Sequence, residues 1–134
     1  MGTDVVLVTQ GRPAALPNVR VLVVEDDVDT RELLTTALES YGAAVTAAAS
    51  GVDALTALKT EPCDVLVADI GMADMNGYAL IRTIRALANE AERRLPAIAL
   101  TVYASTTERE DAFAAGYDRH IVKPIDPEQL AAIN

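Results

Sequence analysis

The chain has 134 residues, of which 51% are hydrophobic and 23% are charged, and its formal net charge is −9. This length suits one hydrophobic core, and the composition is neither that of a disordered chain nor that of a fibrous one. The negative charge disfavours direct binding to nucleic acid or to an anionic membrane surface, because both would repel the protein on approach.

The only cysteine, Cys63, cannot form an internal disulfide. The N-terminus has neither the basic region nor the long apolar run of a signal peptide. No apolar stretch reaches the roughly 20 residues that span a bilayer. We therefore expect a cytoplasmic protein, with no membrane insertion by this chain.

The N-terminal segment shows no sustained hydrophobic period. A short apolar run at residues 5–8 is followed by Gly11, Pro13 and Pro17, a mixture typical of linkers. We interpret residues 1–18 as a linker or N-terminal extension and residues 19–134 as one folded domain.

From residue 19 onward, β-branched apolar runs alternate with amphipathic segments. Strands are predicted at residues 19–24, 43–48, 65–68, 97–101 and 120–122. Helices are predicted at residues 30–41, 52–59, 77–88 and 107–115. Asp126 and Pro127 open a last helix that stops early, with Asp126 as its N-cap. Such alternation predicts an α/β fold, in which right-handed crossovers build a parallel sheet with helices on both faces.

Polar side chains gather where the predicted strands end. They are Glu25, Asp26 and Asp27 after the first strand, Asp69 after the third, Thr101 at the end of the fourth and Lys123 after the fifth. Ligands of open parallel sheets bind at the carboxyl ends of the strands. We therefore expect these six residues to meet at one edge of the sheet.

Crowded carboxylates repel one another, and either a raised pKa or a bound hard cation resolves the conflict. Mg²⁺ fits, since it needs only one or two carboxylates, water and a phosphoryl oxygen. An aspartate beside such an ion can attack phosphorus, while Lys123 neutralises phosphoryl charge and Thr101 donates a hydrogen bond. Taken singly, an acidic turn, a strand-end threonine and a surface lysine are usually structural. Their joint occurrence favours a functional site.

Four separated stretches, at residues 21–27, 64–72, 99–101 and 122–124, resemble the receiver domain of two-component response regulators. The resemblance covers the chain from about residue 19 to its end. It implies a flavodoxin-like, doubly wound sheet of five parallel strands in the order 2-1-3-4-5. It also implies a phosphoacceptor switch that a histidine kinase or phosphotransfer domain phosphorylates, and that as an isolated domain catalyses only its own phosphorylation and dephosphorylation.

Residue roles follow from the resemblance position by position. Asp69 is implied as the phosphoacceptor, and Glu25 and Asp26 as the acidic pair, with Asp26 as the direct ligand of Mg²⁺ and Asp69 beside it. The backbone carbonyl of Gly71 is implied as a further metal ligand, and whether Asp27 contributes stays open. Thr101 and Lys123 take the switch-hydroxyl and phosphate-pairing roles, and the peptide bond before Pro124 is expected to be cis.

The chain also departs from the family pattern. Ala73 and Asn76 stand where proline and aspartate are usual, and Asn76 can still cap the helix that follows. Val102 replaces a small residue after the switch threonine. His120 stands where the family has the Tyr or Phe that rotates inward, so we expect it to act in the switch with Thr101. Our hypothesis for the bulky Tyr103 is that it slows loss of the phosphoryl group.

The stretches at residues 69–72, 77–82 and 120–127 resemble receivers at the C-terminal end of hybrid sensor histidine kinases. We therefore expect the chain to be part of such a kinase, with a stand-alone single-domain regulator as the alternative. A Mg²⁺-dependent aspartyl-nucleophile phosphatase is disfavoured, because Gly71 stands where such enzymes carry a second acid. A pseudo-receiver is disfavoured by the intact Asp69, Thr101 and Lys123. The sequence does not identify the cognate kinase or the downstream partner, and it is compatible with a homodimer.

Overall fold

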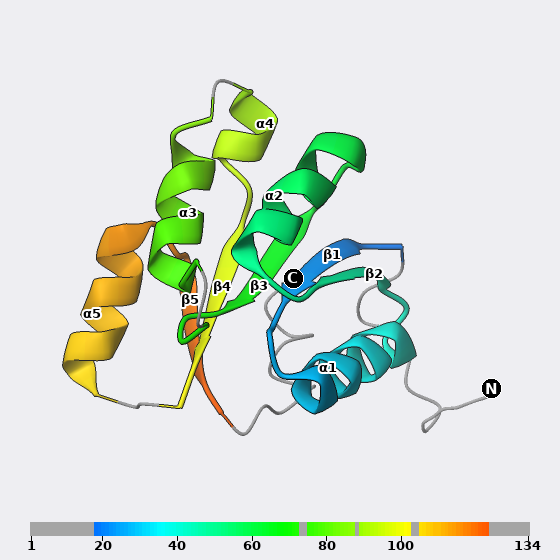
Figure 1. Ribbon diagram of the computed structural model, residues 1–134, viewed down its shortest axis with the longest axis horizontal. Coiled ribbons are helices and arrows are strands. Elements are labelled where there is room, and N and C mark those ends of the chain that lie inside the picture. Colours follow the sequence, from blue (N-terminus) through cyan, green and yellow to red (C-terminus); the bar gives the residue numbers. More distant parts are fainter. Residues whose placement is uncertain (1–17, 73–74, 88, 103–104, 124–134) are drawn as a thin grey trace.

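The computed structural model describes residues 18–72, 75–87, 89–102 and 105–123. Within this part of the chain, five strands form one parallel sheet in the order β2-β1-β3-β4-β5 (Figure 1). The strands are β1 (Arg20–Val24), β2 (Ala44–Ala48), β3 (Val65–Asp69), β4 (Ala97–Thr101) and β5 (Arg119–Val122). The predicted fold class and strand order are therefore confirmed.

Helices cover both faces of the sheet (Figure 1). They are α1 (Val28–Ser40), α2 (Gly51–Thr60), α3 (Gly77–Arg85), α4 (Glu90–Arg93) and α5 (Thr106–Ala115). On one face, Leu34 and Leu38 of α1 pack on the strands in one buried cluster. On the other face, apolar residues of α2, α3 and α5 form a second cluster. None of the helices in the described residues is long and apolar enough to cross a bilayer.

The central strands are buried on both faces, which explains their unbroken apolar sequence. Every residue of β3 and of β4 is buried, as expected for parallel strands between two helical layers. The edge strand β2 is only partly buried, which matches its weaker sequence signal. The sheet thus provides a rigid base whose carboxyl edge carries the polar residues.

Helix α1 begins at Val28, two residues earlier than the predicted start at Thr30. The third acid of the run, Asp27, is its N-cap, and the carboxylate of Asp27 accepts a hydrogen bond from the Thr30 N–H at 2.9 Å. Capping satisfies a backbone donor that a helix start otherwise leaves without a partner. The local sequence presented three equivalent acids, and the structure separates one of them as a cap.

The single helix predicted over residues 77–88 is divided in the structure. Helix α3 ends at Arg85, because the N–H groups of Ala86 and Leu87 turn back onto carbonyl groups three residues earlier. Asn89 then caps the four-residue helix α4, which we did not predict. So short a helix has no hydrophobic period to reveal it.

Several predicted features lie outside the described residues. They are the linker over residues 1–17, the loop residue Ala73, Tyr103, the cis peptide bond before Pro124, and the last helix that opens at Asp126 and Pro127.

Candidate functional site

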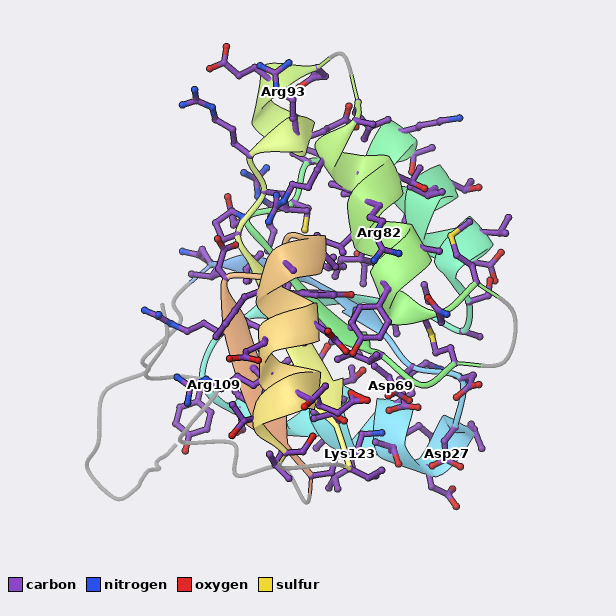
Figure 2. The ribbon with its side chains drawn as sticks, turned by 90° about the vertical axis from the view of Figure 1, so that its left-hand side faces the viewer. Asp27, Asp69, Arg82, Arg93, Arg109 and Lys123 are labelled. Carbon is purple, nitrogen blue, oxygen red and sulfur yellow. The ribbon has the colours of Figure 1, made fainter. Side chains whose placement is uncertain are left out.

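The strand register brings the polar strand ends to one edge of the sheet. Asp69 is the last residue of β3 and pairs in register with Leu100 of β4, and Thr101 pairs with Val122 of β5. Glu25 follows β1 directly, and its N–H donates to the carbonyl of Ala48 at 3.1 Å. Figure 2 shows Asp69 and Lys123 at this edge, beside the start of α1 where Asp27 lies.

Three carboxylates meet at this edge. One carboxylate oxygen from each of Glu25, Asp26 and Asp69 lies within 4.8 Å of the other two. Glu25 is only 1% exposed and Asp69 only 9%, whereas Asp26 is exposed to solvent. Oxygen donors at this spacing are the kind that a hard divalent cation prefers. The structure therefore brings together the acidic residues that the sequence predicted as metal ligands.

Lys123 provides the positive charge among these acids. Its Nζ lies 2.8 Å from Glu25 Oε1 and 3.3 Å from Asp69 Oδ2. Burial disfavours the charged form of Lys123, but its hydrogen bond to Glu25 and the charge of Asp69 outweigh this, so the pKa of Lys123 is raised. Burial also raises the pKa of Glu25, against the opposing hydrogen bond from Lys123. Lys123 is thus a charged group that bridges two buried carboxylates.

The loop after β3 fixes the orientation of the Asp69 carboxylate. The N–H of Gly71 donates to Asp69 Oδ1 at 3.0 Å, while Lys123 holds the other oxygen. Among the residues that the structure describes, a Cβ added at Gly71 would meet only Asp69 Oδ1, at 3.8 Å. Asp69 is therefore buried and held at both carboxylate oxygens.

Thr101 and His120 lie on the neighbouring strands β4 and β5. Thr101 is 4% exposed at the end of β4, and its carbonyl accepts the N–H of Lys123 at 2.6 Å. His120 lies opposite Ala99, two positions before the strand end. Burial and the nearby Arg109 of α5 lower the pKa of His120, and its buried Nε2 has no hydrogen-bond partner among the residues that the structure describes. Thr101 is therefore at the edge with Asp69, while His120 lies further back, under α5.

Two contributors to this edge were missed in the sequence. Arg31 of α1 donates from Nη1 to the carbonyl of Glu25 at 2.9 Å, which ties the acidic turn to the helix. Tyr117 donates from its hydroxyl to the carbonyl of Gly77 at 2.8 Å, in a buried position. The spacing of Arg31 within the first turns of a helix after the acids is a weak signal. Tyr117 gives none, since its partner is 40 residues away in the sequence.

Comparison with known proteins extends the resemblance seen in the sequence. The family model of the response regulator receiver domain matches residues 21–133. An uncharacterized 14.6 kDa protein of Leptolyngbya boryana is 43% identical over 115 residues, which cover 86% of this chain and 86% of that protein. The sensor histidine kinase GacS of Pseudomonas protegens is 38% identical over 117 residues, which cover 85% of this chain but only 12% of the kinase.

A solved structure matches the fold as well. It is the receiver domain of the sensor histidine kinase PA1611 from Pseudomonas aeruginosa, which has a magnesium ion coordinated in its active site cleft. The two structures agree with a TM-score of 0.78 at 32% sequence identity, over 87% of this chain and 93% of that chain. Fold, strand order and family match agree: the chain belongs to the response regulator receiver domain family, and is a phosphoacceptor switch of two-component signalling.

Proposed function

We propose that Asp69 is the phosphoacceptor and that it takes its phosphoryl group from the phosphohistidine of a histidine kinase or phosphotransfer domain. One observation carries the proposal: the side chain of Asp69 is only 12% exposed, and its Oδ2 lies 3.3 Å from Lys123 Nζ. A buried carboxylate that is held at one edge of a parallel sheet, beside a lysine, suits nucleophilic attack on phosphorus.

In the proposed reaction, a carboxylate oxygen of Asp69 forms a bond to phosphorus while the bond between phosphorus and the histidine nitrogen breaks. The product is an acyl phosphate on Asp69, and the electron pair leaves with the imidazole, which takes a proton from solvent. Lys123 already lies within reach of Asp69 and neutralises charge on the phosphoryl oxygens. The Gly71 N–H keeps the carboxylate oriented during the attack.

The donor set fits Mg²⁺ as the cofactor. Asp26 and Asp69, with the backbone carbonyl of Gly71, would hold the ion directly, and Glu25 would complete the acidic cluster. When bound, Mg²⁺ draws together the incoming phosphoryl group and the carboxylates by screening their charges. Support comes from the oxygens within 4.8 Å of one another and from the magnesium ion in the Pseudomonas aeruginosa receiver.

We also propose that Thr101 and His120 transmit the effect of Asp69 phosphorylation to the rest of the domain. Phosphorylation places new negative charge beside the buried Thr101, whose hydroxyl can donate to it. Movement at the end of β4 would reach β5 and α5, where Arg109 is near enough to His120 for its charge to lower the pKa of the histidine. The shift between two packings is then what a downstream partner reads.

Two contexts are proposed for the domain. In the first, the domain is part of a hybrid sensor histidine kinase, as its similarity to a region covering 12% of GacS suggests. As a stand-alone regulator, it would resemble the 14.6 kDa relative, of which it spans 86%. In both contexts residues 19–134 form the receiver, residues 1–18 a linker or extension, and the cytoplasm is the compartment. An immunoblot of the source cells separates the two by the size of the band.

The phosphoacceptor role is tested by incubating the protein with Mg²⁺ and acetyl phosphate and then measuring its intact mass. The proposal predicts a gain of one phosphoryl group in the wild type and none in Asp69→Asn. Asp64→Asn is the matched control, because Asp64 precedes the same strand but pairs with Arg20 at the opposite edge. Labelling that persists in Asp69→Asn contradicts the proposal. Turnover of phosphoesters would favour a phosphatase instead. A wild type that gains no mass would favour a pseudo-receiver.

A further inference from the structure

Tyr117 is a buried phenol that no function has yet been given. It follows Gly116, the positive-φ residue (129°) that ends α5, and its own N–H donates to the carbonyl of Ala112 at 3.1 Å. The side chain is 3% exposed and belongs to the core between the sheet and α3. Tyr117 is thus anchored to the end of α5 by its backbone, and its ring lies inside the core.

The hydroxyl of Tyr117 reaches the first residue of α3. It donates to the carbonyl of Gly77 at 2.8 Å. Burial, with the nearby charge of Asp69, raises the pKa of Tyr117, so the phenol keeps the proton it donates. The hydrogen bond therefore persists through the neutral pH range.

Gly77 in turn lies directly against the backbone of the phosphoacceptor. A Cβ added there would be 2.7 Å from Ile70 Cα, 2.9 Å from the Asp69 carbonyl oxygen and 3.0 Å from the Tyr117 hydroxyl. The Gly77 N–H donates to the Ile70 carbonyl at 3.0 Å, which closes the loop that follows β3. Gly77 is thus packed tightly between the Tyr117 hydroxyl and the backbone of Asp69 and Ile70.

Gly71 orients the carboxylate of Asp69, because its N–H donates to Asp69 Oδ1. Gly71 directly follows Ile70, whose carbonyl accepts the Gly77 N–H. A shift of Gly77 would therefore be passed through Ile70 to Gly71, and from there to the orientation of the carboxylate. Small misplacements of a reacting group can cost large factors in rate.

We propose that Tyr117 is a positioning residue for the phosphoryl chemistry of Asp69: its hydroxyl holds Gly77 against the backbone of Asp69 and Ile70 and so fixes the position of Gly71, which orients the carboxylate. The proposal rests on Asp69 being the phosphoacceptor. Tyr117 also connects the end of α5 to the start of α3, because it follows α5 in the chain and its hydroxyl bonds to the carbonyl of Gly77.

The test compares Tyr117→Phe with the wild type and with Tyr78→Phe. Tyr78 is the matched control, because it lies beside Gly77 and also loses a phenol hydrogen bond, but to Glu108 of α5 at 3.0 Å. Initial rates of labelling by acetyl phosphate are measured by intact mass at saturating Mg²⁺, over a range of donor concentrations. Thermal unfolding of each variant ensures that the assay temperature lies well below its transition.

For Tyr117→Phe we expect about a tenfold fall in the maximal labelling rate, with the half-saturating acetyl phosphate concentration changed less than about twofold. Tyr78→Phe should keep both within about twofold of the wild type. A folded Tyr117→Phe with the wild-type maximal rate would overturn the proposal, and so would equal losses in the two variants. A wild type that takes no label refutes the proposed phosphoacceptor instead.

Hydrogen exchange of the wild type gives a second readout if Tyr117→Phe does not fold. Because Tyr117 joins the two regions, phosphorylation should change exchange in residues 75–80 and in residues 116–118 together. A change confined to residues 75–80 would overturn the proposal.

Discussion

The two edges of the sheet both carry charged residues, but they pair them in different ways. At the amino edge, Arg20 donates from Nε and Nη2 to both oxygens of Asp64 at 3.0 Å, and Arg85 pairs with Asp118 at 3.1 Å. At the carboxyl edge, the buried carboxylates of Glu25 and Asp69 share one lysine. Asp64 and Asp118 at the amino edge thus each pair with a different arginine, whereas Glu25 and Asp69 at the carboxyl edge share one lysine.

The pKa values of the acids reflect this difference. Hydrogen bonds from Arg20 lower the pKa of Asp64, whereas burial raises that of Glu25. Each charge of the amino-edge pairs already has a partner of opposite charge, so these pairs do not call for a cation. Buried acids with too little positive charge favour a cation, which supports the function proposed for the carboxyl edge.

The largest expected effect comes from removing the shared lysine. Lys123→Met leaves two buried carboxylates without their partner and should lower the free energy of unfolding by about 3 kcal/mol in the absence of metal. Mg²⁺ should restore part of this loss. Urea unfolding with and without Mg²⁺ measures both effects. Arg20→Met at the amino edge, where the pair is exposed, should cost much less than Lys123→Met and gain nothing from Mg²⁺. Equal losses at the two edges would contradict the comparison.

Mg²⁺ itself should stabilise the wild type. A ligand present at 100 times its dissociation constant adds about 2.7 kcal/mol if it binds only the folded state. The expected result is a rise in the unfolding midpoint that a chelator reverses and that Asp26→Asn abolishes. Asp29→Asn, an exposed acid in the first turn of α1 but outside the cluster, should keep the full rise. Loss of the rise in both variants would point to general screening of negative charge.

Substitution of Gly71 and of Gly77, which follow β3, should have very different effects on stability. Gly77→Ala places a methyl group 2.7 Å from Ile70 Cα and should cost about 2 kcal/mol by overpacking. Among the described residues, a methyl group at position 71 meets nothing closer than 3.8 Å, so Gly71→Ala should change stability by less than about 0.5 kcal/mol. Thermal unfolding of the two variants tests this, and similar midpoints would show that the loop is not held tightly.

The smallest effect is a pH dependence at the amino edge. Because the folded-state pKa of Asp64 is lowered by Arg20, its contribution is present above the unfolded pKa near 3.8 and is lost as the pH falls through the folded value. The pair is largely exposed, so Asp64→Asn should cost only about 0.5 kcal/mol at neutral pH. The difference from the wild type should vanish in acid; a difference independent of pH would rule out the ion pair as its source.

Most of the fold was predictable because its signals are local. The apolar runs that became β1, β3 and β4 mark buried parallel strands, and the polar residues that end them meet at one edge by topology alone. The strand order followed from the family resemblance. The four-residue α4 and the end of α3 at Arg85 depend on backbone turns without a hydrophobic period, so no pattern in the sequence reveals them.

The sequence predicted which residues gather at the carboxyl edge, but not the different burial and partners of each one. Three consecutive acids look alike in the sequence, yet in the structure Glu25 is buried against Lys123, Asp26 is exposed beside Asp69, and Asp27 caps α1. These differences come from neighbours distant in sequence, such as Lys123. The contact of Tyr117 with Gly77 was invisible for the same reason, since both the burial of the phenol and its partner depend on tertiary packing.

The most direct test of the account is to locate the phosphoryl group. Reduction of the labelled protein with borohydride converts a phosphorylated aspartate to homoserine, which peptide mass spectrometry can assign to a position. We expect homoserine at position 69 alone, and only when Mg²⁺ was present during labelling. Homoserine at position 26 or 64, or labelling of Asp69 that does not depend on Mg²⁺, would contradict the claim that the carboxyl edge is a Mg²⁺-dependent phosphoacceptor site.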